Sequence, residues 1–562
     1  MAAGLTPLSA SAFPGFIAGK GGEKAVVHST HAVIMERGDR SVVTVMADYE
    51  GPIEDFALVM VVPEDVTAER VATLKRDYVD RVDKLTAPRF HDFYEPDPCE
   101  PGEWGQEWER SLKASDTGAV LGQFKTDPEK KVAKELFVDT EAKQKKGEYE
   151  LEVLDGEGAL KTWLAKVGLK APAEAGAAVA PYLEQGMKLL VAKVDANRIE
   201  LVGGDRAQLS PIRFWTERPY EKFPARAGLA SAPPFQELVL YVFHPEKRFE
   251  VKNYHTMFPP TNITVTKDVW ERVGEFYNGV YDKLLAKDPK TVLAEFAWPI
   301  EGCGEPCPDA PLMVSELMSL GGDVFEEAIP EADRRPEPPE PTKEEEEKFK
   351  ATLEGKKPKE KKEAKKAWEE ERAQIAYVQA LQQRNKYILS RLHYRYNATT
   401  LSEDLELAPA GPVEGGIDLP KGPKGVASTE VKPAKDSRLQ VRFNFLEPNI
   451  KAVNCEKPER WRWGKRPREV MRLRKTWVAD DLTRKSRTQI KPEQVILSPV
   501  PALGLTGAPT NEAKVEAKPE KPAEKEGCGC RVVDSKSPHP KASLLMLALG
   551  GVAVAVRRKR RH

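Results

Sequence analysis

The sequence has few cysteines, almost no net charge and no familiar catalytic motif. Its 562 residues include 6 cysteines, and 87 lysines and arginines against 88 aspartates and glutamates leave a formal net charge of −1. Without an overall field to attract a polyanion, we expect no nucleic acid partner. G-x-S-x-G, H-E-x-x-H, phosphate-binding glycine loops and the dinucleotide fingerprint are all absent. This favours a non-catalytic protein that needs no cofactor. A hydrolase without a local motif stays the alternative, because glycosidase carboxylates can lie far apart in sequence.

The end of the chain, residues 527–562, has the composition of a membrane-targeting segment. Gly527-Cys528-Gly529-Cys530 is followed by a polar spacer, the apolar run 542–556 and the basic run 557–561. As a helix, the apolar run would span roughly 22 Å, less than the hydrocarbon core of about 30 Å. Since Lys and Arg resist translocation, the order predicts a domain outside the membrane, a short transmembrane helix and a cytoplasmic stop. A buried C-terminal helix is the alternative, and the consecutive cations disfavour it.

This arrangement resembles the MYXO-CTERM sorting tag of myxobacteria and their relatives. The resemblance implies that an envelope sorting protease acts on the tail and that the protein is held at the cell surface or outer membrane. The anchoring cysteine would be Cys528 or Cys530, and the presence of two leaves the choice open. A soluble periplasmic protein that uses the tail only as a membrane anchor is a further alternative.

Residues 1–12 resemble only the end of a signal peptide. Ala10-Ser11-Ala12 has the small residues of a cleavage site, but neither a basic nor an apolar region precedes it. We expect the true translation start to lie upstream and the mature chain to begin near Phe13.

Four cysteines lie in the body, and an even number in an exported chain suggests disulfides. Three connectivities are possible. Cys303 and Cys307 could close a small loop, and Cys99 with Cys455 would then join the start of the body to its end. A metal site would need another cysteine pair or histidines at ligand spacing, so we predict none.

Strand and helix patterns predict an α+β body with largely antiparallel sheet and packed helices. Residues 32–35 and 41–46 predict a hairpin around the turn 36–40, and 56–62 would extend it to a meander. Amphipathic helices are expected at 71–85 and 269–285, and shorter ones at 160–167 and 173–187. Further strands are expected at 149–154, 189–194, 199–202, 212–214, 238–243, 249–251, 390–407 and 438–446.

The composition divides the chain into segments. The body covers residues 13–333 and 390–497. Between these ranges, 334–389 holds a charged insertion. Its Pro/Glu/Lys-rich part, up to residue 366, cannot bury an apolar face and is expected to be helical or disordered. A helix is expected over 367–389. A flexible Pro/Ala/Lys/Glu linker, 498–526, leads to the tag.

Several stretches of the body resemble a secreted bacterial family catalogued as domain of unknown function 2330. The stretches begin at Asp48, Asp83, Thr162, Ala180, Leu189, Leu209 and Leu389, and the last reads Leu389-Ser390-Arg391-Leu392-His393-Tyr394-Arg395-Tyr396. The resemblance implies export and a fold, but no chemistry, because the family has no assigned reaction. Pro14 stands where the family usually has a cysteine, which puts any family disulfide from that position in doubt.

A metal site near the N-terminus is the first candidate constellation. His28 and His31 are followed by acidic residues that could join them as ligands. An extended segment spreads such side chains apart, and the acidic stretch has ordinary turn composition, so we favour a structural turn. The acidic residues are Asp48, Glu50, Glu54 and Asp55.

The second candidate mixes cations with tryptophans and would contact an anionic polymer. For a surface protein, an anionic polysaccharide or lipopolysaccharide is a more suitable partner than nucleic acid. The alternative is a basic surface whose tryptophans pack on the body. The residues are Trp461, Arg462, Trp463, Lys465 and Arg466.

Overall fold

The computed structural model describes residues 13–20, 25–52, 54–99, 148–203, 206–230, 235–302, 304, 307, 310–464 and 490–507. These residues belong to one compact unit, 1–510, and the second unit, 511–562, lies outside them. The start 1–12, the tag with its apolar run 542–556 and most of the linker are therefore not described. Among the described helices, none combines the length and the apolar character needed to cross a membrane.

The predicted hairpin is confirmed and lies within the largest sheet. β2 (Ser29–Arg37) and β3 (Arg40–Glu50) pair antiparallel, from the pair Thr30 and Ala47 to the pair Arg37 and Arg40. Gly38 lies in the turn between them with φ 58°, a conformation that costs little without a Cβ. β13 (Gln236–His244) then pairs parallel with β2, and β18 (Ile388–Tyr396) pairs antiparallel with β13.

In the described residues this sheet contains 13 strands, mostly antiparallel. Its other strands are β5 (Val71–Thr73), β9 (Glu200–Gly203), β10 (Arg206–Gln208), β11 (Ile212–Thr216), β15 (His255–Met257), β17 (Thr291–Pro299), β20 (Val413–Gly415), β21 (Lys432–Pro433) and β22 (Arg438–Gln440).

The predicted meander is wrong, because the third strand joins another sheet. β4 (Phe56–Val62) lies between β1 (Gly15–Ala18) and β8 (Lys188–Val194), and β7 (Tyr149–Leu154) completes this four-stranded antiparallel sheet. Every residue of β4 is buried, so the strand needs cover on both faces. One face packs on the large sheet and the other on α5 (Gly156–Val167) and α6 (Ala175–Leu183).

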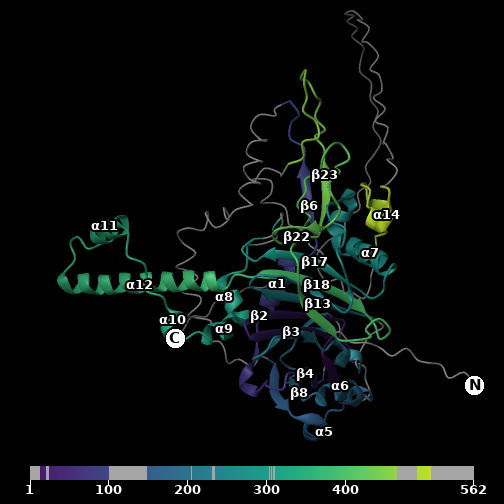
Figure 1. Cartoon of the computed structure of the whole chain (residues 1–562), viewed down its shortest axis with the longest axis vertical. Coiled ribbons are helices and arrows are strands. Elements are labelled where there is room, and N and C mark those ends of the chain that lie inside the picture. The colour runs from purple at the N-terminus through teal and green to yellow at the C-terminus, as the bar shows by residue number, and fades with distance from the viewer. Residues whose placement is uncertain are drawn as a thin grey trace, which may run out of the picture. The chain divides into compact units, whose positions relative to one another are not determined.

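The two sheets pack face to face with helices on both outer faces, which confirms the predicted α+β class (Figure 1). Their facing sides share one apolar core, which includes Ile34, Val45, Leu58 and Leu190. The outer face of the large sheet is covered by α1 (Arg76–Thr86), α7 (Val273–Leu285), α8 (Val314–Leu317), the π-turn η5 (Met318–Gly322) and α9 (Asp323–Glu327).

Two predicted helices begin later than expected. The N-terminal part of the predicted helix 71–85 is strand β5, which pairs with β11, and α1 begins only at Arg76. Likewise the 3-10 helix η4 (Lys267–Arg272) precedes α7. Smaller 3-10 helices are η1 (Ala68–Arg70) and η3 (Ala225–Ala230).

The charged insertion is more ordered than the sequence predicted. It contains α11 (Lys343–Thr352) and α12 (Pro358–Arg384), and α12 begins before the predicted residue 367, while α10 (Glu331–Arg334) ends where the insertion begins. Local interactions account for this: a capping box at Thr342, Lys–Glu pairs four residues apart, and stacked rings of Phe349 and Trp368. α12 ends at Arg384 because the following residues enter β18, whereas the prediction extended the helix to 389.

Two small sheets complete the fold. One has the order β16 (Ile263–Thr264), β23 (Arg442–Glu447), β6 (Arg89–Tyr94), and the other β12 (Lys222–Phe223), β19 (Leu405–Ala410), β14 (Arg248–Val251). The segment 490–507, with α14 (Pro492–Val495) and the 3-10 helix η6 (Pro501–Leu503), packs beside the first of these. Val500 and Leu503 are buried there, so the first part of the predicted linker belongs to the body.

Candidate functional site

Strand alternation places three cationic side chains of β18 on one face of the large sheet. Arg391, His393 and Arg395 are two residues apart, so they share a face, while Leu392 and Tyr394 point into the core between the sheets. All three are buried beneath α1 and α7. A buried charge is costly unless it is paired, so their partners decide what this cluster does.

His393 lies between two buried glutamates. Its Nδ1 is 2.8 Å from Oε1 of Glu295, and its Nε2 is 2.8 Å from Oε2 of Glu237. Because ionised carboxylates only accept hydrogen bonds, both ring nitrogens must donate and the ring is a cation. Burial opposes this charge, but Glu295 and Glu237 outweigh it and raise the pKa of His393 above its usual value.

The two arginines extend the network in both directions. Arg391 donates to Oε2 of Glu295 and to Oδ1 of Asp83, both at 2.5 Å. Arg395 donates to Oε1 of Glu237 at 2.6 Å, and the other hydrogen-bond partners of its guanidinium lie on α7. Those contacts are Oδ1 of Asn278 at 2.7 Å and the carboxylate of Asp282.

Beyond Asp83 of α1, the network continues through Tyr241 and ends at His31 of β2. Tyr241 donates its hydroxyl hydrogen to Oδ1 of Asp83 at 2.6 Å, and Nδ1 of His31 lies 2.8 Å from the same hydroxyl. Burial lowers the pKa of His31 to about 4, so the ring is neutral at pH 7. Burial alone would raise the pKa of Asp83, but Arg391 outweighs it and the pKa falls to about 2.

This network is suited to holding elements together. Glu295 and Glu237 are at most 1% exposed, and each carboxylate oxygen of both accepts a hydrogen bond from a protein group. Because these carboxylates are buried and already paired with protein donors, they are out of reach of a water or substrate at the surface. The ion pairs join β13, β17 and β18 to α1 and α7, so their role is structural.

The first predicted constellation has a structural role as well. Oδ1 of Asp48 accepts hydrogen bonds from the backbone N–H groups of His28 and Ser29, and Oδ2 accepts one from Arg206. His28 faces Glu50 at 3.2 Å, whereas His31 belongs to the network above. The described residues contain no group of His, Cys, Asp and Glu side chains placed to hold a metal ion.

The predicted basic and aromatic stretch is divided between packing and surface. Trp463 is 5% exposed and donates to the carbonyl oxygen of Gly422, so it packs on the body as in the alternative interpretation. Trp461 is half-buried and Arg462 is exposed, paired with Glu459. Lys465 and Arg466 lie outside the described residues.

A buried glutamate and a disulfide fix this stretch to β6. Glu95 accepts hydrogen bonds from the backbone N–H groups of Trp461 and Asn449. The predicted disulfide Cys99–Cys455 is confirmed. Cys307 is also disulfide-bonded, while Cys303, its predicted partner, and the tail cysteines Cys528 and Cys530 lie outside the described residues.

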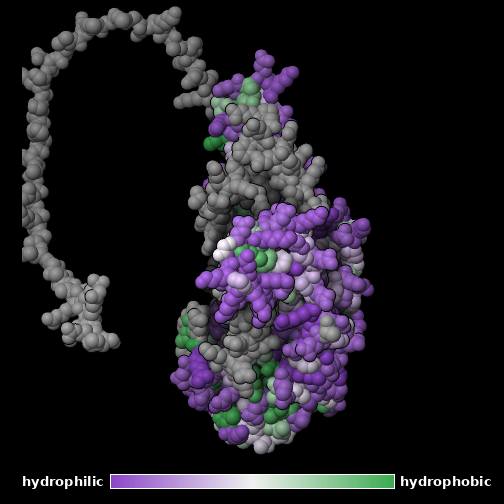
Figure 2. All heavy atoms as spheres, turned by 90° about the vertical axis from the view of Figure 1, so that its left-hand side faces the viewer, coloured by the Kyte–Doolittle hydropathy of each residue, from purple (hydrophilic) through white to green (hydrophobic). Residues whose placement is uncertain are grey.

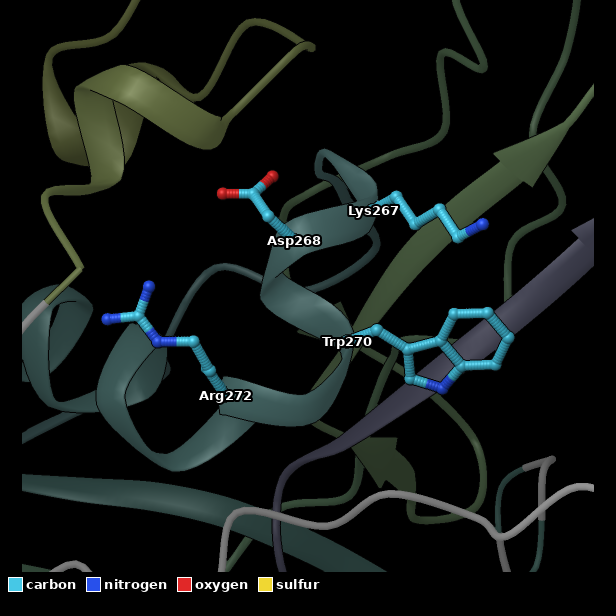
Figure 3. A pocket seen from close by; sticks show the side chains of 4 residues that line it. All are labelled: Lys267, Asp268, Trp270 and Arg272. Carbon is cyan, nitrogen blue, oxygen red and sulfur yellow. The ribbon is translucent and has the colours of Figure 1, made fainter. Parts of the chain in front are cut away.

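The described surface also has a hollow of about 210 Å³ beside η4, which the sequence analysis did not predict. Lys267, Asp268, Trp270 and Arg272 line it (Figure 3). Lys267 and Trp270 point to one side of η4, and Asp268 and Arg272 to the other. The sequence held only a weak signal, since Trp270 lies between Lys267 and Arg272 but beside the acidic Asp268 and Glu271, and periodicity assigned the segment to a helix.

Trp270 is fixed in place by aromatic neighbours. Its half-buried ring stacks on Phe90 of β6 and Phe445 of β23, with ring centroids 6.2 Å and 6.0 Å away. Arg272 is held by Glu275, while the Lys267 side chain is exposed. A fixed indole beside a cation is suited to contact a sugar ring that carries a negative group.

Comparison with known families identifies the body of the chain. A family model for uncharacterised proteins conserved in bacteria, DUF2330, matches residues 8–408. The chain belongs to this family. The DUF2330 region contains the four-stranded sheet, the large sheet except β20, β21 and β22, the whole buried network and Trp270, and it ends before β23 and the Trp461 segment. No curated protein and no solved structure matches the chain.

Proposed function

We propose that this DUF2330 protein is exported, anchored at the cell surface through its tail, and binds an anionic polysaccharide of the envelope without catalysis. The Cys99–Cys455 disulfide supports export, because such bonds persist in oxidising compartments and are rare in the cytosol. The processing of Cys528 or Cys530 by an envelope sorting protease is part of the same proposal.

The observation that carries the binding role is Trp270, a half-exposed indole that two aromatic side chains fix beside Lys267. The three-stranded sheet of β16, β23 and β6, on which Trp270 stacks, also borders the Trp461 segment. Tyr94 at the end of β6 forms a bridge with Gly464. Trp461 lies under the guanidinium of Arg460, 4.7 Å from its ring centroid. The sheet thus presents two tryptophan and cation pairs.

Cell fractionation tests the location. Full-length protein should be found in the envelope fraction and be degraded by protease added to intact cells, and deletion of residues 527–562 should release it from the envelope. A control variant with Cys528→Ser and Cys530→Ser should also be released if a cysteine carries the anchor. Full-length protein that keeps its C-terminus and stays in the cytosol would refute the proposal.

Binding of polygalacturonate, a carboxylated polysaccharide, tests the site. We expect Trp270→Ala or Lys267→Ser to weaken binding at least about tenfold, as for a central aromatic contact, and added salt to weaken it further. Trp215→Ala is the matched control, because Trp215 is also half-buried beneath an arginine, Arg70. Equal affinity of the wild type and both site variants would exclude this site.

A further inference from the structure

Helices α11 and α12 form a hairpin that stands out from the body. α11 has no buried residue, and the buried residues of α12 begin only at Ala376. The rings of Phe349 and Trp368 stack with centroids 4.4 Å apart and hold the two helices together. Figure 1 shows α12 extending away from the sheets, and the face in Figure 2, seen from that side, is mainly hydrophilic where it is coloured.

The first half of α12 carries an excess of lysine. Residues 356–366 contain seven lysines and two glutamates, and all seven lysines are exposed. Lys365 and Lys366 pair with glutamates one turn later. Within the described part of the chain, the ammonium groups of the other five have no carboxylate partner, although the backbone N–H of Lys357 donates to Glu360. These five are Lys356, Lys357, Lys359, Lys361 and Lys362.

The helical lysines lie on one side of α12. Lys359, Lys362 and Lys366 are separated by three and four residues, and Lys361 and Lys365 by four, so the two rows run side by side. Over about two turns they form a continuous cationic strip. We call these five residues of α12, Lys359, Lys361, Lys362, Lys365 and Lys366, the lysine strip.

Helix stability does not explain the lysine strip. The N-terminus of a helix is the positive end of its dipole, where acidic side chains stabilise and cations destabilise. α11 follows this rule with Glu344, Glu345 and Glu346 in its first turn, whereas α12 has only Glu360 there, between Lys359 and Lys361. Three cations of the strip, Lys359, Lys361 and Lys362, therefore lie near a positive pole without a carboxylate partner and are available to a negatively charged partner outside the chain.

We propose that the lysine strip binds the surface of a membrane that contains anionic lipids. A straight helix with cations on one side can place all of them against a planar surface at once. A flexible polymer can wrap around a helix, so its binding does not require the cations to lie on one side. Each basic residue close to such a surface strengthens binding about fivefold. The strip shares no residue with the Trp270 hollow, so this proposal and the polysaccharide proposal succeed or fail separately.

Sedimentation with vesicles tests the proposal. The probe is vesicles of equal amounts of phosphatidylglycerol and phosphatidylcholine, and pure phosphatidylcholine vesicles are the reference. The protein should bind only the anionic vesicles, and the triple variant K359Q/K361Q/K362Q should bind them on the order of a hundredfold more weakly. Because the variant removes cations from the positive pole, its helix content and thermal stability should not fall.

The matched control is K343Q/K348Q/K350Q on α11, which changes the net charge equally. Glu344 and Glu346 already neutralise Lys348 and Lys350, so binding should weaken less than about fivefold. An equal loss in both variants would show a general charge effect and overturn the proposal. So would unchanged binding by K359Q/K361Q/K362Q, or binding of soluble polyphosphate without binding of the vesicles.

Discussion

At the scale of single residues, the most informative feature is His393 and its two glutamates. Glu295 and Glu237 are 98 and 156 residues away from it in sequence. The alternation of Arg391, His393 and Arg395 could predict that they share a face. The partners could not be predicted, because pairing between distant strands decides which carboxylates lie opposite.

Glu295→Gln should destabilise the protein strongly. The variant keeps the shape of the side chain but leaves Arg391 and His393 without their shared anion, and breaking a buried pair costs about 3–5 kcal/mol. Urea unfolding measures this loss. Glu217→Gln, at a side chain that is 52% exposed, is the control and should change the free energy of unfolding by less than about 0.5 kcal/mol. A loss below about 1 kcal/mol in Glu295→Gln would contradict a charged network.

At the scale of elements, local sequence patterns predicted well which segments are strands or helices. They predicted less well which segments pack against each other. The β2–β3 hairpin was predicted correctly because a short turn joins its strands. β4 follows directly but belongs to the other sheet, since a strand buried on both faces must be covered twice. The charged composition of α12 predicted exposure correctly and underestimated order, because capping and ion pairs stabilise a helix without a core.

The Cys99–Cys455 disulfide secures the described segment 448–464, which lies beside β6 and contains no helix or named strand of its own. Cys99→Ser should lower the free energy of unfolding by about 2–5 kcal/mol and make residues 449–464 more sensitive to proteolysis. The double variant Cys99→Ser/Cys455→Ser should lose no more than the single one, because one substitution already removes the bond. Wild-type stability in Cys99→Ser would contradict the assignment.

At the scale of the whole molecule, two histidines make stability depend on pH in opposite directions. The pKa of His31 is lowered to about 4, so its protonation favours the unfolded chain as pH falls below about 6.5. The pKa of His393 is raised, so its contribution is full below about 6.5 and is lost as pH rises through the folded value. The free energy of unfolding should therefore decrease on both sides of the range near pH 6.5.

His31→Gln should reduce the acid side of this profile. Between pH 6.5 and 5, the variant should lose less stability than the wild type by on the order of 1 kcal/mol. Asp83 and Glu295, whose pKa values are lowered, will still lose stability in acid. Urea unfolding from pH 5 to 9 measures the profile, and an acid side as steep as in the wild type would contradict a neutral buried His31.

The sequence by itself determined the α+β class, the hairpin and the exposed insertion, and it offered Cys99–Cys455 as one of the possible disulfide pairings. Each depends on local periodicity, on composition or on a small number of cysteines, which the order of residues contains directly. It also supplied the family resemblance that the match over residues 8–408 confirms.

Only the tertiary structure decided which sheet β4 joins, which carboxylates meet Arg391 and His393, and where Trp270 and the lysine strip lie. These features depend on contacts between segments far apart in the chain. Burial makes such contacts specific, because a charge or an apolar face removed from water must find a partner, and the global packing determines which partner is within reach.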